Sequence, residues 1–265
     1  MLKIKMNKFD IRIIFLFFFT LDVLSENIGQ PGELFPIKVN KGIFTSSNGL
    51  IKIDNSYYKL VPLSFSKQGQ YVMFQDTKIF IQNKDFGESR ITITNNALVN
   101  LSDEDKDRTI RESKIINKAL QTYSKKMNPT FRFISPVDGI ISSRYGKKRF
   151  INNSPRSPHL ALDIAAPEGT KVLSPEDGKV ILIGNFFYSG NYLIIDHGQG
   201  LLSSYSHLSS ISVSEDDILM QGQEIGKVGS TGRVTGPHLH WTVYYEKVRI
   251  NPESLLKDNY LEALL

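Results

Sequence analysis

Two short histidine-containing segments, PHLALD and PHLHW, constrain this chain more than any other feature. They hold three of its five histidines. Successive side chains of an extended strand point to opposite faces, so PHLALD places His159 and Asp163 on one face and leucines on the other. PHLHW likewise places His238 and His240 on one face, with apolar side chains behind them. Each segment therefore predicts a strand with an apolar back and a metal-binding front.

The residue types of these segments suit zinc. Imidazole nitrogens and carboxylate oxygens are ligands that zinc accepts, and a catalytic zinc takes three protein ligands while a fourth position stays open. His159, Asp163 and one histidine of the HxH pair would supply three ligands, and the small Ala161 leaves room for an ion. Either motif alone often occurs by chance, and an isolated HxH is more often a pair of ordinary surface histidines. Their joint occurrence on two alternating apolar segments predicts one zinc site.

Three stretches, in order, resemble the catalytic domain of the lysostaphin-type (LytM-like) zinc metallopeptidases, which cut the peptide part of bacterial peptidoglycan. The stretches are PHLALDIAAPEGTKVLSPEDGKV, IIDHGQGLLSSYSHLS and GQEIGKVGSTGRVTGPHLHW. The match runs over about residues 133–253, nearly half of the chain. The resemblance implies a zinc endopeptidase with one zinc ion per chain and a peptidoglycan peptide as its substrate.

The resemblance also implies a role for each residue of the motifs. In that family the first His and the Asp of HxxxD and the second His of HxH bind zinc, which corresponds to His159, Asp163 and His240. The two catalytic histidines that are not ligands correspond to His207, in the YSHL segment, and His238. Between the ligands of the first motif this chain has Ala where family members often have Gly. No ligand or catalytic position is missing.

The remaining pattern predicts a mainly β protein. Residues 26–100 contain short runs rich in Ile, Val, Phe, Tyr and Thr between turn signals, which predicts a small immunoglobulin-like β domain. Residues 102–124 predict a linking helix, since Ser102 is a good N-cap and three acids follow in the first turn. From residue 131 onward, strands and Asp-Gly turns predict the antiparallel β-sheet of the metallopeptidase domain.

These observations divide the chain into five expected parts. They are a signal peptide (1–25), an accessory β-sandwich domain (26–100), a helix and linker (101–130), a lysostaphin-type zinc peptidase domain (131–255) and a C-terminal tail (256–265).

The first 25 residues differ from the rest. Four basic residues precede or begin an apolar run at 13–21 that ends before Asp22. A membrane-spanning helix needs about 20 apolar residues, so this shorter run predicts a secretory signal peptide. Cleavage is expected after Ser25, and an uncleaved signal would leave the protein anchored. We therefore expect a protein exported to the periplasm or cell envelope.

The charge of the chain is mildly basic. The formal net charge is +5, and removal of residues 1–25 leaves +3, because that segment carries four basic and two acidic residues. This excess predicts weak attraction to anionic envelope polymers and no nucleic-acid binding, since no basic run interleaves with aromatic residues. The chain has no cysteine, which excludes disulfides, cysteine nucleophiles and thiolate zinc ligands. We expect a monomer, and a regulatory partner in the envelope is left open.

Two other motifs receive structural interpretations. His197 lies in a predicted hairpin turn, where a structural role is preferred. The glycine-rich run 226–236 lacks the GK[ST] ending of a phosphate-binding loop, so we expect it to bring backbone close to a substrate groove before His238. No HExxH helix with a glutamate base is present, so histidines would have to move protons. Which histidine is the general base is left open.

Three functions remain to be weighed. A zinc endopeptidase is favoured because every ligand and catalytic position is retained, with D-alanine–diaminopimelate cross-links preferred over glycine bridges. A non-catalytic murein-binding regulator of other cell-wall hydrolases is the alternative. A sugar-cleaving enzyme would need a carboxylate pair in a groove, which the sequence does not indicate. A further hypothesis is that the N-terminal β domain or the 102–124 helix covers the groove and keeps the enzyme inactive.

Overall fold

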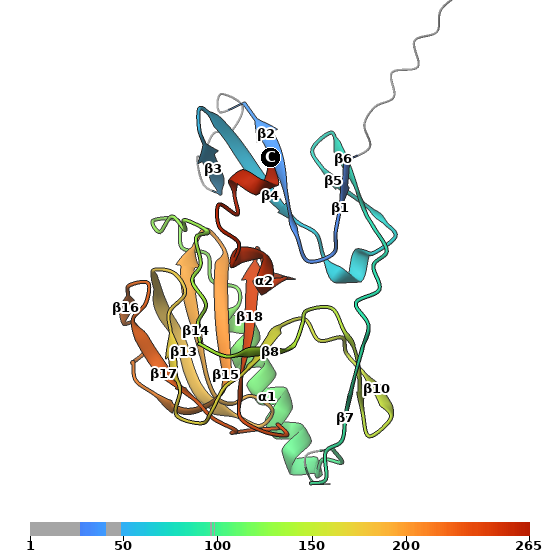
Figure 1. Ribbon diagram of the computed structural model, residues 1–265, viewed down its shortest axis with the longest axis vertical. Helices are drawn as coiled ribbons and strands as arrows, with labels where there is room; N and C mark the ends of the chain where they lie inside the picture. Colours follow the sequence, from blue (N-terminus) through green and yellow to red (C-terminus); the bar gives the residue numbers. More distant parts are fainter. Residues whose placement is uncertain (1–26, 41–48, 96, 98) are drawn as a thin grey trace, which may run out of the picture.

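The computed structural model describes residues 27–40, 49–95, 97 and 99–265 (Figure 1). The predicted signal peptide, residues 1–25, lies outside the described residues. Among the residues described, no helix is both long and apolar enough to cross a membrane. The described chain is mainly β, with small sheets in its N-terminal part, one long helix, and a large sheet in its C-terminal part.

A ten-stranded antiparallel sheet forms the C-terminal part. Its strands are β8 (Ile140–Ser143), β11 (Leu162–Ala165), β12 (Lys171–Leu173), β13 (Gly178–Phe186), β14 (Gly190–Gly198), β15 (Leu201–Ile211), β16 (Ile218–Leu219), β17 (Glu224–Val228), β18 (His238–Tyr245) and β19 (Val248–Ile250). Seven of them follow the order β16-β13-β14-β15-β18-β11-β8, while β17 joins β12 to β15 and β19 pairs with β18. The predicted antiparallel sheet is confirmed.

Alternating side chains give β18, an interior strand of this sheet, two different faces. Leu239, Trp241 and Val243 are each 0% exposed and belong to the main core. Full burial of a large apolar side chain contributes about 1.5–3 kcal/mol. His238 and His240, which alternate with Leu239 and Trp241 in the sequence, are only partly buried on the opposite face. The predicted apolar back and histidine front of this strand are confirmed.

Two three-stranded sheets precede the large one (Figure 1). The first contains β1 (Asn27–Gly29), β5 (Tyr71–Phe74) and β6 (Thr77–Ile81), and the second contains β2 (Leu34–Val39), β3 (Leu50–Ile53) and β4 (Ser56–Pro62). A short 3-10 helix, η1 (Phe65–Lys67), follows β4. Leu63, Ile79 and Ile81 form a small buried cluster of their own. Short strands were predicted in this part of the chain, and the structure confirms them.

A third small sheet joins the two parts of the chain. It contains β7 (Glu88–Ile91), β9 (Lys148–Ile151) and β10 (Ser154–Arg156). β7 runs parallel to β9, with Ser89 aligned to Arg149. The Asn152 amide reinforces this pairing, because it accepts from the Ile93 nitrogen at 2.9 Å and donates to the Ile93 oxygen at 3.0 Å. A strand from the N-terminal part therefore packs beside C-terminal residues.

The long helix α1 (Asp103–Ala119) connects the N-terminal sheets to the large sheet. Ser102 caps its first turn, as predicted. The helix ends earlier than the predicted residue 124, because the residues after it form hydrogen-bonded turns. Glu112 accepts a hydrogen bond from the Phe187 nitrogen at 2.8 Å. This acidic side chain therefore fixes the helix to the end of β13 instead of only facing solvent.

The last residues pack on the core. They include α2 (Pro252–Leu255) and the 3-10 helix η3 (Glu262–Leu264). Tyr260 is 5% exposed, and Leu261 and Leu264 contact the main core. Residues 256–265 thus cover apolar surface between the large sheet and β2.

Candidate metal centre

Strand register builds the centre of the site. β11 and β18 pair so that Asp163 lies directly opposite His240. On its other side β18 pairs with β15, which aligns Ser206 with His240. Directly opposed residues have Cβ atoms about 4.5–5.5 Å apart. The sheet itself therefore brings the carboxylate and the imidazole together.

His159 reaches the site from outside the sheet. The prediction that one strand runs from His159 to Asp163 was wrong, because β11 begins at Leu162. The His159 nitrogen donates to the Lys147 oxygen at 2.9 Å, and the Gly146 nitrogen donates to the His159 oxygen at 2.7 Å. The segment before β11 therefore bonds to the turn before β9. Its two polar side chains still meet, as predicted.

His159, Asp163 and His240 form a compact ligand set. His159 Nε2 lies 3.0 Å from Asp163 Oδ1 and 3.3 Å from His240 Nδ1, and His240 Nδ1 lies 2.7 Å from Asp163 Oδ1. Ligands of a tetrahedral zinc, bound at about 2.0–2.1 Å, lie about 3.3 Å from one another. The donor types and their spacing therefore fit zinc, and these three residues can hold a metal ion.

A backbone carbonyl orients His159. Its Nδ1 lies 3.2 Å from the Arg144 oxygen. A carbonyl only accepts hydrogen bonds, so Nδ1 carries the proton and Nε2 presents its lone pair to the other two ligands. His240 faces the ligand set through Nδ1, and its Nε2 lies 3.5 Å from the Thr242 hydroxyl. The two imidazoles therefore use different nitrogens.

The electrostatics of the triad favour the protonation states that metal ligands need. Burial alone would raise the pKa of Asp163, but the His240 and His159 imidazoles beside it hold that pKa well below its usual range. Burial lowers the pKa of His240 by more than the nearby Asp163 carboxylate raises it. At pH 7 the carboxyl group is therefore ionised and His240 is neutral, ready to bind a cation.

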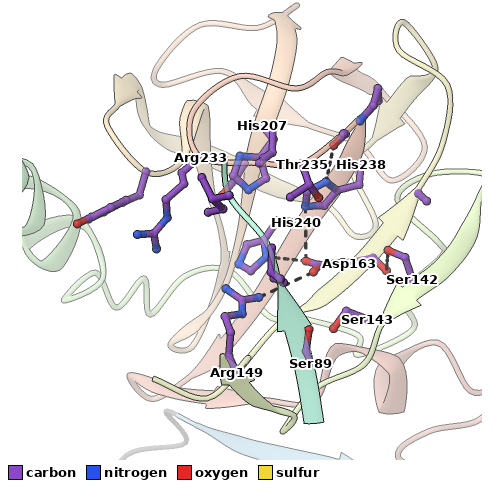
Figure 2. Close-up of a pocket in the computed structure, with 18 of the residues that line it drawn as sticks. Ser89, Ser142, Ser143, Arg149, Asp163, His207, Arg233, Thr235, His238 and His240 are labelled. Atoms are coloured by element: carbon purple, nitrogen blue, oxygen red, sulfur yellow. Dashed lines mark hydrogen bonds and ion pairs between the residues drawn. The ribbon is translucent and has the colours of Figure 1, made fainter. Parts of the chain in front are cut away.

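Two further histidines, His207 and His238, lie beside Asp163 and His240 (Figure 2) and are not members of the ligand set. The ring centroids of His207 and His238 are 4.9 Å apart, and His238 Nε2 lies 4.0 Å from Asp163 Oδ1. The His207 and His240 centroids are 5.8 Å apart. Burial, reinforced by the neighbouring histidines, lowers the pKa of His207 to about 3. All four candidate histidines of the sequence analysis are thus gathered around Asp163.

Both of these rings are held by main-chain carbonyls. His207 Nδ1 lies 2.8 Å from the Thr231 oxygen, and His238 Nδ1 lies 2.9 Å from the Gly236 oxygen. Each neutral ring therefore carries its proton on Nδ1 and leaves Nε2 as an acceptor. His207 has φ of +67°, a left-handed conformation that is costly for a residue other than glycine. This conformation coincides with a break in the β14–β15 register.

The triad carboxylate and three of the histidines line a pocket of about 420 Å³ (Figure 2). Residues 233–237 form part of its wall, which confirms that the glycine-rich loop lies at the groove. Ser89, Ile91 and Ile93, in and after β7, also line it. A segment from the N-terminal part of the chain therefore borders the site.

Sequence reasoning missed two arginines of this pocket, Arg149 and Arg233. Arg149 Nη2 lies 3.9 Å from Asp163 Oδ2. In the sequence Arg149 belongs only to a short basic run beginning at Lys147, and no motif distinguishes Arg233. The pairing of β9 with β7 and the fold of the glycine-rich loop bring them to the site, and neither event has a local sequence signal.

His197 lies elsewhere, in β14, and is 2% exposed. Its ring bonds to the Asp177 oxygen at 2.8 Å and to the Ser203 hydroxyl at 2.7 Å. Burial lowers its pKa to about 4. It does not line the pocket, which agrees with the structural role expected for it.

Known proteins share sequence similarity with the part of the chain that contains this site. Residues 157–252 match the family described as Peptidase family M23. The peptidoglycan DD-endopeptidase ShyA of Vibrio cholerae serotype O1 is 42% identical over 127 residues, which cover 47% of this chain and 29% of that protein. The DD-carboxypeptidase/endopeptidase Mpg of Neisseria meningitidis serogroup B is 41% identical over 97 residues, which cover 37% of this chain and 22% of that protein. The chain thus spans less than a third of the length of either relative.

One solved structure resembles the chain over most of its length. A crystal structure from Pseudomonas aeruginosa, described as a peptidase M23, has a TM-score of 0.64 and 29% sequence identity. The similarity covers 85% of this chain and 94% of that one. The arrangement of the N-terminal sheets and the large sheet is therefore shared beyond the matched family region.

Replacing any member of the triad by alanine removes one of three ligands, so we expect the zinc affinity to fall more than about 100-fold. His159→Ala, Asp163→Ala and His240→Ala should behave alike in a zinc titration against a competing chelator. His207→Ala and His238→Ala are the matched controls and should keep an affinity within about 10-fold of the wild type. Wild-type affinity in His240→Ala would contradict the assignment.

Proposed function

The chain belongs to peptidase family M23, and from this premise we propose that it is a zinc-dependent endopeptidase that hydrolyses peptide cross-links of bacterial peptidoglycan. The observation that carries the proposal is the convergence of a His-Asp-His ligand set and two further histidines, all of which except His159 line one pocket. All five residues fall within the matched region, residues 157–252. The relative ShyA is described as a peptidoglycan DD-endopeptidase, which supports this choice of substrate.

We assign one zinc ion per chain to His159, Asp163 and His240. When bound, zinc polarises a carbonyl group and lowers the pKa of a bound water to about 7. The Asp163 carboxylate offsets part of the positive charge of the ion, while the Arg144 carbonyl keeps His159 in the tautomer that can bind it. The chain thus supplies a preorganised site in which His240 is neutral at pH 7 and His159 presents Nε2.

We assign proton transfer to His207 and His238. With Nδ1 committed to a backbone carbonyl, each Nε2 can take up a proton and later return it. His238 Nε2 lies 4.0 Å from Asp163 Oδ1, and the ring centroids of His207 and His238 are 4.9 Å apart. Both rings are therefore close enough to the ligand set to exchange protons with a substrate held there.

The other functions are less well supported. A glycoside hydrolase needs two carboxyl groups on either side of a groove. Among the described residues that line the pocket, Asp163 is the only acid, and it belongs to the ligand set. A non-catalytic regulator of other cell-wall hydrolases would not require five retained site residues. The cleavage experiment below distinguishes this regulatory alternative from the endopeptidase.

We also propose the wider setting of this activity. Residues 1–25 would direct export to the periplasm or cell envelope, and the protein would act there as a monomer on peptidoglycan. Residues 26–100 would form an accessory domain of immunoglobulin-like character, joined through residues 101–130 to a peptidase domain at 131–255. Two small three-stranded sheets before α1 are the observation that supports this division.

Access to the site would be limited by the segment that contains β7. Ser89, Ile91 and Ile93 line the pocket together with Asp163, whereas α1 contributes only Ile116, and to the neighbouring hollow beside His240. The segment is held by its pairing with β9 and by the two Asn152 hydrogen bonds to Ile93. The sequence left two segments that could cover the groove, the N-terminal β domain and the 102–124 helix. The N-terminal strand β7 is therefore the better candidate.

Purified cross-linked peptidoglycan treated with the zinc-loaded wild-type protein and then digested with a muramidase should yield more monomeric and fewer cross-linked muropeptides, as measured by liquid chromatography and mass spectrometry. His207→Asn and His238→Asn should bind zinc normally but cleave about 100- to 10,000-fold more slowly, because they lack a proton acceptor. The bond cleaved is read from the products. Zinc binding without any cleavage by the wild type would favour the regulatory alternative.

Loosening the β7 segment should increase the rate of cross-link cleavage several-fold. Asn152→Gly removes the two side-chain hydrogen bonds to Ile93, and glycine accepts the φ of +48° found at this position. Asn153→Gly is the matched control, because its φ is +62° and its side chain is exposed. Equal rates in the wild type and both variants would show that the segment does not limit access.

A further inference from the structure

A second hollow continues from the metal centre past His240. Its volume is about 480 Å³. The two hollows share the wall residues Arg149, Tyr188, Ser189, Ser206, Arg233 and His240. A group bound in the second hollow would therefore lie next to a group bound at the metal centre.

The second hollow is strongly basic. Four arginines line it, namely Arg149, Arg156, Arg233 and Arg249. Among the described residues that line the two hollows, the only carboxylate is that of Asp163, which the metal centre already uses. The positive charge of this hollow is therefore not balanced by acids in its own wall.

The guanidinium of the buried Arg149 has a hydrogen-bond donor without an acceptor among the described residues. Arg149 comes from β9 and keeps only 22% of its side chain exposed. Its Nη2 lies 3.9 Å from Asp163, beyond direct hydrogen-bonding distance, and its buried Nε has no hydrogen-bond partner among the described residues. Burial lowers the pKa of this guanidinium. A buried, unpaired donor is costly, so an added acceptor would stabilise the site.

Arg233 approaches from the glycine-rich loop. Its backbone nitrogen donates to the Tyr188 oxygen at 3.0 Å, and its guanidinium stacks on the Tyr188 ring at 4.1 Å. Burial lowers its pKa, and the charges of Arg149 and Arg156 lower it further. Figure 2 shows Arg149 and Arg233 on the side of His240 that faces away from Ser142 and Ser143. Their mutual repulsion would be relieved by a shared anion.

We propose that Arg149 and Arg233, with Arg156 at the rim, bind a free carboxylate of the substrate peptide next to the bond that is cleaved. Guanidinium groups bind carboxylates through paired, charge-assisted hydrogen bonds. This subsite rests on the proposed endopeptidase function, because a peptide held at the metal centre would place its neighbouring groups in the second hollow.

The subsite discriminates between the two types of cross-link considered from the sequence. In a D-alanine–diaminopimelate cross-link, the amide nitrogen is attached to a carbon that also bears a free carboxylate. A glycine bridge has no carboxylate in its interior. A pair of arginines beside the metal centre therefore selects the diaminopimelate cross-link and makes no use of a glycine bridge.

Binding of a muropeptide monomer tests the subsite without relying on cleavage. The probes are the monomer with a free carboxylate on the diaminopimelate carbon that bears the amine, and the same monomer amidated there. The free acid should bind about 10-fold more tightly or better in calorimetry, since it makes charge-assisted hydrogen bonds that the amide loses. Arg233→Ala and Arg149→Ala should each abolish most of this difference. Arg111→Ala, an exposed arginine of α1, is the matched control and should keep it.

Two further arms separate the alternatives. The preference for the free acid should persist in His240→Ala, whereas its loss there would identify zinc as the carboxylate receptor and overturn the proposal. Inorganic phosphate that competes as well as the free acid would indicate a general anion site and also overturn it. Arg233→Lys keeps the positive charge but loses the paired donors of the guanidinium, and it should retain part of the preference. If the wild type cleaves nothing but still prefers the acid, the endopeptidase function fails while the subsite stands.

Discussion

The pairing of β11 with β18 in one register is the constraint on which the rest of the site depends. Side chains of a strand alternate with a period of two, so a shift by one residue would turn Asp163 and His240 to different faces. The same shift would expose Leu239 and Trp241, both 0% exposed. Each contributes about 1.5–3 kcal/mol through burial. The apolar face therefore fixes the positions of ligands that it never touches.

The rest of the site depends on hydrogen bonds outside this regular pairing. His159 is delivered by a segment that bonds to the turn before β9, and His207 by a break in the β14–β15 register with a left-handed backbone. Main-chain carbonyls then set the tautomer of His159, His207 and His238. The regular strand pairing makes the site rigid, and these irregular positions orient the imidazole rings. Arg149 and Arg233 add positive charge that the single carboxylate of the pocket does not balance.

The predictable part of this protein is the part encoded in short sequence windows. Alternation in PHLHW correctly predicted the two faces of β18, and Ser102 followed by acids correctly predicted the start of α1. Zinc chemistry predicted His159, Asp163 and one histidine of the HxH pair, and the family resemblance indicated His240 as that histidine. Alternation failed at His159, where backbone hydrogen bonds with Gly146 and Lys147 outweigh the strand pattern. The placement of the two arginines and of β7 at the pocket could not be predicted, since it depends on pairing between distant parts of the chain.

Hydrolysis that depends on zinc held by His159, Asp163 and His240 is tested most directly by titrating zinc into the metal-free protein while following the loss of cross-linked muropeptides. We predict that the cleavage rate rises in proportion to added zinc and stops rising at about one ion per chain, as three ligands and one open position require. Asp163→Asn should remain inactive at the same zinc concentrations. Cleavage by the metal-free wild type, or zinc-dependent cleavage by Asp163→Asn at the wild-type rate, would contradict this role of the triad.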